Sequence, residues 1–211
     1  MNIVLAIDSN MHPLEFLDIC TNVNVHSIKI NSLYHFLMNN YPSALNTYAE
    51  ENTPPLFLDL KLYDTPTTVK NTVSNLHKVV EYVTLTYLDN IDSIHAGVEE
   101  CFYRGITPFV VGKLTSSLPE KPTQNLRTWF NNWCTDLAHI SNDIGVVVPY
   151  YFLDIAKKFK FKHTLTPGIY INNKHKGQKA TISIDAVSNY DPDLIVIGRS
   201  YKQWLQLTQV I

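Results

Sequence analysis

Residues 57 to 69 read Phe-Leu-Asp-Leu-Lys-Leu-Tyr-Asp-Thr-Pro-Thr-Thr-Val, an apolar run that carries three charges and then enters a predicted helix at Pro66. Alternate residues of an extended strand share a face, so Asp59 and Lys61 are expected to project together. Asp64 falls just past the strand end, where a turn could return it toward the pair. Such neighbours favour each other's ionised forms, and the cluster is costly to desolvate. The alternative is a strand end with ordinary solvated charges.

Short apolar runs alternate with longer amphipathic runs along the chain. Strands are predicted at Asn2–Asp8, Val25–Ile30, Pro55–Lys61, Tyr82–Thr86, Thr107–Leu114, Asp143–Val148, His163–Thr166 and Asp193–Gly198. Helices are predicted at Pro13–Thr21, Ser32–Tyr48, Thr67–Val79, Ile94–Arg104, Thr123–Ile140, Tyr151–Lys158, Ile182–Asn189 and Tyr201–Leu207. These βα repeats predict an α/β protein with one domain over residues 1–211, a (β/α)₈ TIM barrel. The alternative is an open doubly wound sheet, which usually has a glycine-rich first turn, and this chain has none there.

The composition argues against several classes of function. A net charge of −2 gives no general attraction to nucleic acid or to anionic membranes. No G-x-G-x-x-G or P-loop occurs, and no apolar run approaches the roughly 18 residues of a membrane span. The start of the chain lacks a signal-peptide pattern. Cys20, Cys101 and Cys134 have no metal-ligand spacing and are expected to be buried thiols of a reducing compartment. We therefore expect a soluble, cytoplasmic protein without a metal site or a cofactor.

In such a barrel the functional end is where the strands finish. The polar residues at predicted strand ends are Asp8, Lys29, Asp59, Lys61, Asp64, Ser116, Thr166 and Arg199. Gly198 and Arg199 precede a helix and suit an anion, because glycine permits close approach and the guanidinium offers two parallel donors. The alternative for Arg199 is an ordinary surface arginine.

Several motifs make the chain resemble the orotidine 5′-monophosphate decarboxylase family. The family signature D-x-K-x-x-D-I-P-x-T reads Asp59-Leu60-Lys61-Leu62-Tyr63-Asp64-Thr65-Pro66-Thr67-Thr68 here. Shorter family motifs are echoed in order by Ala6-Ile7-Asp8, Leu114-Thr115-Ser116, Leu165-Thr166-Pro167-Gly168-Ile169 and Val196-Ile197-Gly198-Arg199. The matches span residues 6 to 200, essentially the whole chain.

The resemblance implies a catalytic array. Lys61 would protonate C6 of the pyrimidine as carbon dioxide leaves, and Asp59 would lie against the substrate carboxylate. Lys29 and Asp64 would complete an alternating Lys-Asp-Lys-Asp array. Asp64 and Thr68 would reach the neighbouring subunit's site, which implies a homodimer with shared active sites.

The resemblance also implies substrate contacts. Asp8 and Lys29 would contact the ribose hydroxyls, and Ser116 the pyrimidine. The remaining contacts implied are Pro167 in the motif after the seventh strand, Gln178 bridging phosphate and base, and Gly198 with Arg199 on the phosphate. The polar loop from Tyr170 to Ala180 would be a lid that closes on the phosphate.

Four positions depart from the family pattern. Thr65 replaces the motif isoleucine and puts a hydroxyl where an apolar contact to the ring is usual. Thr84-Leu85-Thr86 lacks the histidine of the fourth-strand motif, the "G-D-Q" has become Lys176-Gly177-Gln178, and Asn31 replaces a glycine. These departures indicate a divergent member.

The resemblance implies metal-free decarboxylation of orotidine 5′-monophosphate to UMP and carbon dioxide, the last step of de novo pyrimidine synthesis. One alternative is a magnesium-dependent sugar-phosphate decarboxylase or aldolase of the 3-keto-L-gulonate 6-phosphate type, which shares D-x-K-x-x-D but usually lacks the x-P-x-T matched by Pro66 and Thr68. Another is a non-catalytic barrel kept for nucleotide binding or interaction.

Overall fold

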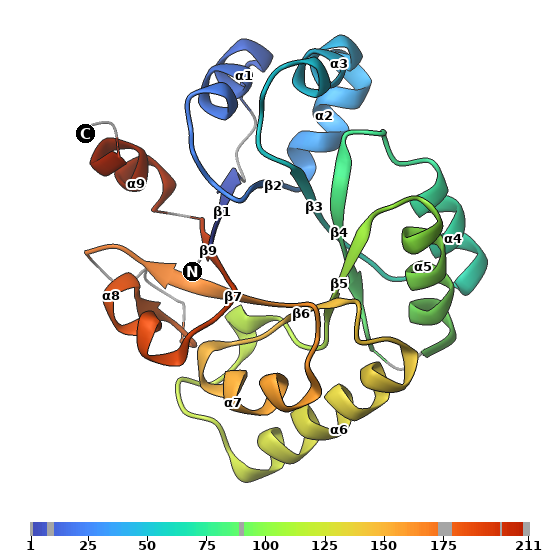
Figure 1. Cartoon of the computed structure of the whole chain (residues 1–211), viewed down its shortest axis with the longest axis vertical. Coiled ribbons are helices and arrows are strands. Elements are labelled where there is room, and N and C mark those ends of the chain that lie inside the picture. Colours follow the sequence, from blue (N-terminus) through green and yellow to red (C-terminus); the bar gives the residue numbers. More distant parts are fainter. Residues whose placement is uncertain (1, 8–10, 89–90, 173–178, 199, 209–211) are drawn as a thin grey trace.

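Parallel strands form a closed ring, with helices packed around its outside (Figure 1). The structure is a computed structural model that describes residues 2–7, 11–88, 91–172, 179–198 and 200–208. The strands of the ring, in sequence order, are β1 Asn2–Ile7, β2 Ser27–Ile30, β3 Leu56–Leu62, β4 Val80–Thr86, β5 Thr107–Val111, β6 Gly145–Val147, β7 His163–Tyr170 and β9 Leu194–Ile197. Each pairs with its neighbours in parallel, and the β7–β9 and β9–β1 pairings close the ring. The predicted TIM barrel is confirmed, and the open sheet is excluded because an open sheet has two unpaired edges.

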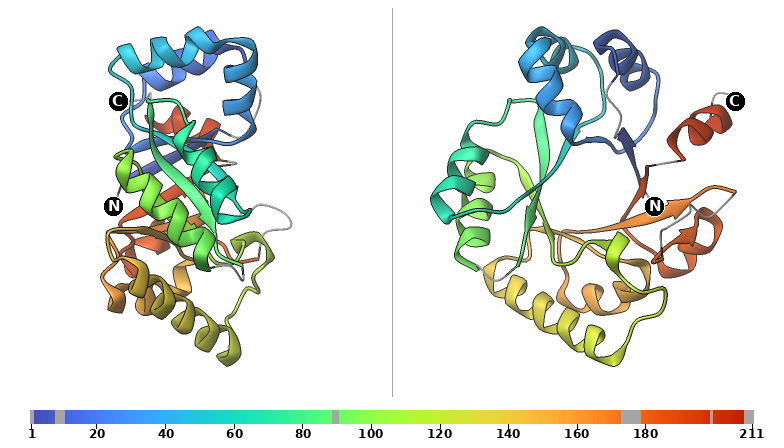
Figure 2. Two further views of the ribbon diagram at one scale, coloured as in Figure 1. Left: turned by 90° about the vertical axis from the view of Figure 1, so that its right-hand side faces the viewer. Right: turned by 180° about the vertical axis from the view of Figure 1, so that it is seen from behind.

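Helices follow the strands and cover the outside of the barrel (Figure 2). The α-helices are α1 Pro13–Thr21, α2 Ser32–Asn40, α3 Pro42–Glu50, α4 Pro66–Ser74, α5 Ile91–Tyr103, α6 Gln124–Ile140, α7 Leu153–Ala156, α8 Ile184–Val187 and α9 Tyr201–Thr208. Short 3-10 turns are η1 Thr115–Ser117, η2 Tyr150–Phe152, η3 Lys157–Phe159 and η4 Ser188–Tyr190. Among the described residues no helix is long and apolar enough to cross a membrane.

Some predicted helices differ from the structure. The single helix predicted at Ser32–Tyr48 is wrong, because the chain leaves helical geometry at Tyr41 (φ −143°, ψ 58°) and starts again at Pro42. Proline has no N–H and its fixed φ suits the first turn of a helix, so Pro42 begins α3 rather than continuing α2. The helix predicted at Ile182–Asn189 is wrong at its start, because Ile182 and Ser183 form the short strand β8, which pairs with the end of β7 and precedes α8.

The interior of the barrel is filled with apolar side chains below its carboxyl end. Phe57 and Phe109 are fully buried, and their ring centroids lie 4.9 Å apart. Above them the smaller side chains of Ala6, Val111 and Val196 leave room for a pocket. Because the middle of the barrel is packed, the pocket opens only where the strands end, as in other barrels of this kind.

Two histidines lie at the opposite end of the barrel. The rings of His26 and His163 are 6.4 Å apart, and His163 also stacks on Phe109. Burial lowers the pKa of His26 below its usual value of 6.5, against the opposing effect of Glu81. Burial and the charge of Lys162 lower the pKa of His163, with Asp193 opposing. Both imidazoles are therefore favoured in their neutral form in the folded protein.

We predict that stability falls as the pH drops below about 6.5, because the unfolded chain then binds protons that these histidines resist in the native state. Urea midpoints measured from about pH 7.5 to pH 5.5 should decrease, and the decrease should be smaller for His163→Asn. The exposed His139 provides a matched control, since His139→Asn should keep the wild-type slope. An unchanged slope in His163→Asn would contradict the prediction. Asp59 does not interfere, because its pKa is lowered from 3.8 and it titrates below this window.

Candidate active site

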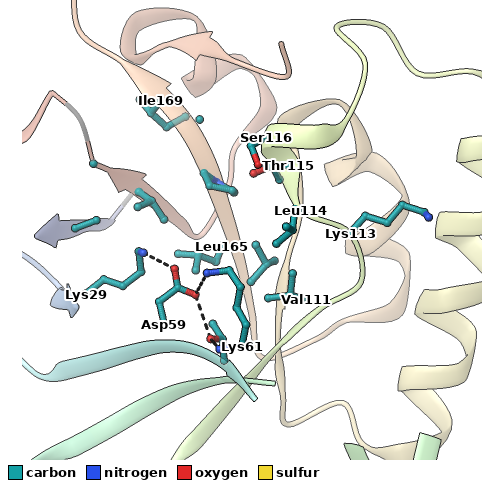
Figure 3. Close-up of a pocket in the computed structure, with 17 residues that line it drawn as sticks. Lys29, Asp59, Lys61, Val111, Lys113, Leu114, Thr115, Ser116, Leu165 and Ile169 are labelled. Carbon is teal, nitrogen blue, oxygen red and sulfur yellow. Dashed lines mark hydrogen bonds and ion pairs between the residues drawn. The ribbon is translucent and has the colours of Figure 1, made fainter. Parts of the chain in front are cut away.

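The carboxyl end of the barrel holds a pocket of about 280 Å³ (Figure 3). Its charged lining residues are Lys29 from β2, Asp59 and Lys61 from β3, and Lys113, which follows β5. Its apolar wall consists of Ala6, Val111, Leu114, Val147, Leu165, Ile169 and Val196. The pocket therefore suits a ligand that combines an apolar part with an anionic group.

Asp59 lies between the two lysines and bonds each through a different oxygen. Its Oδ2 is 2.5 Å from Lys29 Nζ, and its Oδ1 is 2.7 Å from Lys61 Nζ (Figure 3). The side chains of Lys29 and Asp59 are 9% and 13% exposed, whereas that of Lys61 is 38% exposed. The buried pair thus holds the more accessible ammonium of Lys61 at the pocket.

The charge state of Asp59 follows from these contacts. Burial alone would raise the pKa of its carboxyl, but the ammonium groups of Lys29 and Lys61 outweigh burial and lower the pKa to about 2. The carboxylate is therefore ionised at every physiological pH. A fixed anion beside Lys61 keeps that ammonium in place without further reorganisation.

The sequence suggested that regular alternation along β3 brings Asp59 and Lys61 together. The structure shows instead that β3 is irregular between these residues. Leu58 pairs with Val83 and Leu62 with Leu85, so two extra residues of β3 are accommodated opposite β4. Lys61 has a φ of 51°, in the left-handed region that non-glycine residues seldom adopt. The side chains of Asp59 and Lys61 do lie together, but an irregular bulge puts them there.

Asp64 does not join the cluster within its own chain. Its side chain is exposed, and its Oδ1 accepts the N–H of Thr65 at 2.7 Å. Its carbonyl oxygen accepts a hydrogen bond from the buried Ser93 hydroxyl at 2.5 Å. Asp64 is absent from the described residues that line the pocket. The turn after β3 therefore fixes Asp64 outside this site.

Thr65 and Thr68 also lie outside the pocket of their own chain. Thr65 is the N-cap of α4, and its hydroxyl is 3.0 Å from that of Thr68. Within its own chain the Thr65 hydroxyl therefore caps α4 and does not line this pocket. Threonine is favoured at this position because its oxygen can accept an otherwise unpaired N–H of the first helical turn.

The other predicted substrate residues divide into two groups. Ser116 of η1, Pro167 of β7 and Gly198, which follows β9, line the pocket together. Asp8, Gln178 and Arg199 lie outside the described residues. Within the described ranges, no three His, Cys, Asp or Glu side chains are grouped so that they could hold a metal ion.

Sequence reasoning missed two polar residues of the pocket, Thr84 and Lys113. Thr84 lies in the fourth strand motif, where only the missing histidine was considered. Lys113 follows β5 and could have been noticed as a charge at a strand end. Its ammonium lies 4.4 Å from the ring centroid of Trp129 on α6, and its side chain extends away from the Asp59 cluster (Figure 3).

The fold and the site define a class, the (β/α)₈-barrel enzymes whose charged strand ends form the active site. Residues 1–201 match the model of the Orotidine 5'-phosphate decarboxylase / HUMPS family, and the chain belongs to this family. It is 30% identical over 168 residues to an Orotidine 5'-phosphate decarboxylase of Wolbachia pipientis, covering 75% of this chain and 73% of that protein. It is 29% identical over 188 residues to the protein of the same name from Wigglesworthia glossinidia brevipalpis, covering 82% of this chain and 75% of the relative.

Solved structures of the same name share the fold. The orotidine 5'-phosphate decarboxylase of Thermotoga maritima superposes with a TM-score of 0.67 at 19% identity, covering 94% of this chain and 90% of the other. The enzyme of Methanocaldococcus jannaschii complexed with inhibitor BMP has a TM-score of 0.67 at 16% identity. The match covers 95% of this chain and 91% of the other. At these identities the similarity establishes the barrel and no individual contact.

Proposed function

We propose that this protein decarboxylates orotidine 5′-monophosphate to UMP and carbon dioxide in pyrimidine biosynthesis, without a metal or a cofactor. The observation that carries the proposal is the Lys29–Asp59–Lys61 cluster at the carboxyl end of the barrel. The names of the two curated relatives support the same reaction.

The cluster suits the electronic demand of this reaction. When the bond between C6 and the carboxylate breaks, its electron pair stays on C6 and carbon dioxide departs. The ammonium of Lys61 stabilises that charge and then gives C6 a proton, after which solvent reprotonates the amine. Asp59 faces the departing carboxylate and keeps Lys61 oriented. Lys29 keeps Asp59 ionised, as the lowered pKa of Asp59 indicates.

The remaining contacts would bind the nucleotide away from the reacting carbon. Ser116 would contact the pyrimidine, with Pro167 beside it, and Gly198 would approach the phosphate. The family motif assigns Asp8 to the ribose, Gln178 to a bridge between phosphate and base, and Arg199 to the phosphate. Binding free energy from a remote phosphate can be used to stabilise the transition state at C6. The lid predicted from Tyr170 to Ala180 falls largely on residues 173–178, which lie outside the described residues.

We infer that the enzyme is a cytoplasmic homodimer with shared sites. Asp64 and Thr68 are exposed and lie outside the pocket of their own chain, as expected if they serve a neighbour. Large apolar side chains at the same end of the barrel are 40% to 54% exposed: Tyr63, Leu88, Ile91 and Leu114. An apolar surface beside the mouth of the pocket suits a partner subunit.

A second candidate is a magnesium-dependent reaction on a sugar phosphate, because the matched family model also covers the HUMPS proteins. Such an enzyme would need a divalent cation. A third possibility is a barrel that binds a nucleotide without catalysis.

Ultraviolet absorbance of orotidine 5′-monophosphate mixed with the purified protein tests the first candidate, and a parallel assay with a sugar phosphate tests the second. We expect turnover that continues undiminished in excess EDTA. No turnover of orotidine 5′-monophosphate, together with Mg²⁺-dependent release of carbon dioxide from 3-keto-L-gulonate 6-phosphate, would favour the metal-dependent reaction. Binding of UMP with no absorbance change would favour the non-catalytic barrel.

A further inference from the structure

We propose that Thr84 on β4 is a positioning residue, whose hydroxyl holds Lys61 in the geometry for proton transfer. This inference rests on the proposed function of Lys61. Thr84 is 1% exposed, and its side chain lies between the bulge of β3 and the pocket.

The bulge leaves Lys61 without ordinary strand pairing. The ladder between β3 and β4 is regular from Phe57 to Leu58 and resumes only at Leu62. A left-handed conformation is unfavourable for a non-glycine residue, so other contacts must maintain it at Lys61. Backbone strain of this kind persists only where its surroundings enforce it.

Side chains of β4 provide those contacts. The N–H of Lys61 donates to Thr84 Oγ1 at 2.7 Å, and Thr86 Oγ1 donates to the carbonyl oxygen of Lys61 at 3.0 Å. Both peptide groups of the lysine are therefore bonded to threonine hydroxyls.

Thr84 also connects the backbone of Lys61 to the carboxylate that holds its side chain. Its hydroxyl lies 3.1 Å from Asp59 Oδ1, the same oxygen that bonds Lys61 Nζ at 2.7 Å. A weaker alternative acceptor for the hydroxyl proton is the carbonyl of Leu58 at 3.5 Å. One hydroxyl thus accepts from the lysine's peptide and donates to its counter-ion, which closes a ring of hydrogen bonds around Lys61.

This ring fixes both ends of the lysine. Without the hydroxyl, the N–H of Lys61 loses its acceptor and Asp59 loses a donor, so the bulge can relax toward an extended strand. A shift of about 1 Å in a reacting group can cost about 10²-fold in rate. The substrate's remote contacts do not involve this ring.

The test compares Thr84→Val, which keeps the shape but removes the hydroxyl, with Thr84→Ser, which keeps the hydroxyl. We expect Thr84→Val to lower kcat by about 10²-fold while KM and the Kd for UMP change by less than about 3-fold. Thr84→Ser should restore most of kcat. Thr47→Val on α3 is a matched control that removes an exposed helical hydroxyl bonded to Ser43, and it should leave kcat unchanged.

Several results would overturn the proposal: an unchanged kcat in Thr84→Val, a loss carried by KM alone, or a loss that serine does not restore. If Thr84→Val fails to fold, Thr86→Val removes the other hydroxyl and should lower kcat by about 10-fold, again at constant KM. Crystal structures provide a readout that does not depend on turnover. In the Thr84→Val structure, the φ of Lys61 should no longer be positive and its ammonium should separate from Asp59. This structural result tests the role of Thr84 even if the wild-type protein does not decarboxylate orotidine 5′-monophosphate, in which case only the proposed function has failed.

Discussion

Lys61→Ala is expected to lower kcat by at least about 10⁴-fold, because it removes a general acid worth about 10²–10⁴ and a preorganised charge worth about 10²–10³. The lost ammonium is 2.7 Å from Asp59, which keeps Lys29 at 2.5 Å and the Thr84 hydroxyl at 3.1 Å as partners. The site should therefore stay folded, with its carboxylate still paired. Initial rates from the absorbance change, together with UMP binding by calorimetry, separate lost chemistry from lost binding.

Lys158→Ala is the matched control for this experiment, since Lys158 is an exposed lysine on η3 outside the pocket. It should retain wild-type kcat. Equal turnover by wild type and Lys61→Ala would exclude the lysine as the proton donor. If Lys61→Ala loses UMP binding as well as kcat, Lys61 would instead contribute to binding in the ground state.

Mixing Lys61→Ala chains with Asp64→Ala chains should restore activity, although each variant alone is nearly inactive. In a two-fold symmetric dimer with shared sites, random exchange leaves about one site in four with both native residues. Activity should therefore recover to about a quarter of the wild-type value after exchange. The expectation follows from the exposed position of Asp64, which its bonds to Thr65 and Ser93 fix outside its own pocket.

Mixing Lys61→Ala with Asp59→Ala chains is the matched control. Asp59 and Lys61 bond each other within one chain, so no exchange can assemble a complete site from these two variants. Recovery in this control would indicate contamination or another dimer arrangement. No recovery in the Asp64 mixture, with subunit exchange verified, would place Asp64 outside any shared site.

Local sequence rules located most of the barrel. Strands covered on both faces are nearly continuous apolar runs, and β9 was recognisable from Leu194 to Ile197 for that reason. Helix starts that depend on local residue types could also be predicted from the sequence, as at Pro66, where α4 begins. The break between α2 and α3 was missed because the apolar spacing continues through it, and only the geometry at Tyr41 and Pro42 interrupts the helix.

By itself, the sequence determined the order of βα units and the identity of the charges at strand ends, because periodicity and residue type are local properties. Only the tertiary structure decided that Asp59 bonds both lysines, that Asp64 lies outside the pocket, and that Lys61 has a positive φ. Those outcomes depend on the register between β3 and β4, where Thr84 replaces ladder hydrogen bonds at the bulge. Register is a relation between two strands, and a bulge that adds residues to one strand shifts it locally, which the alternation along β3 alone did not reveal.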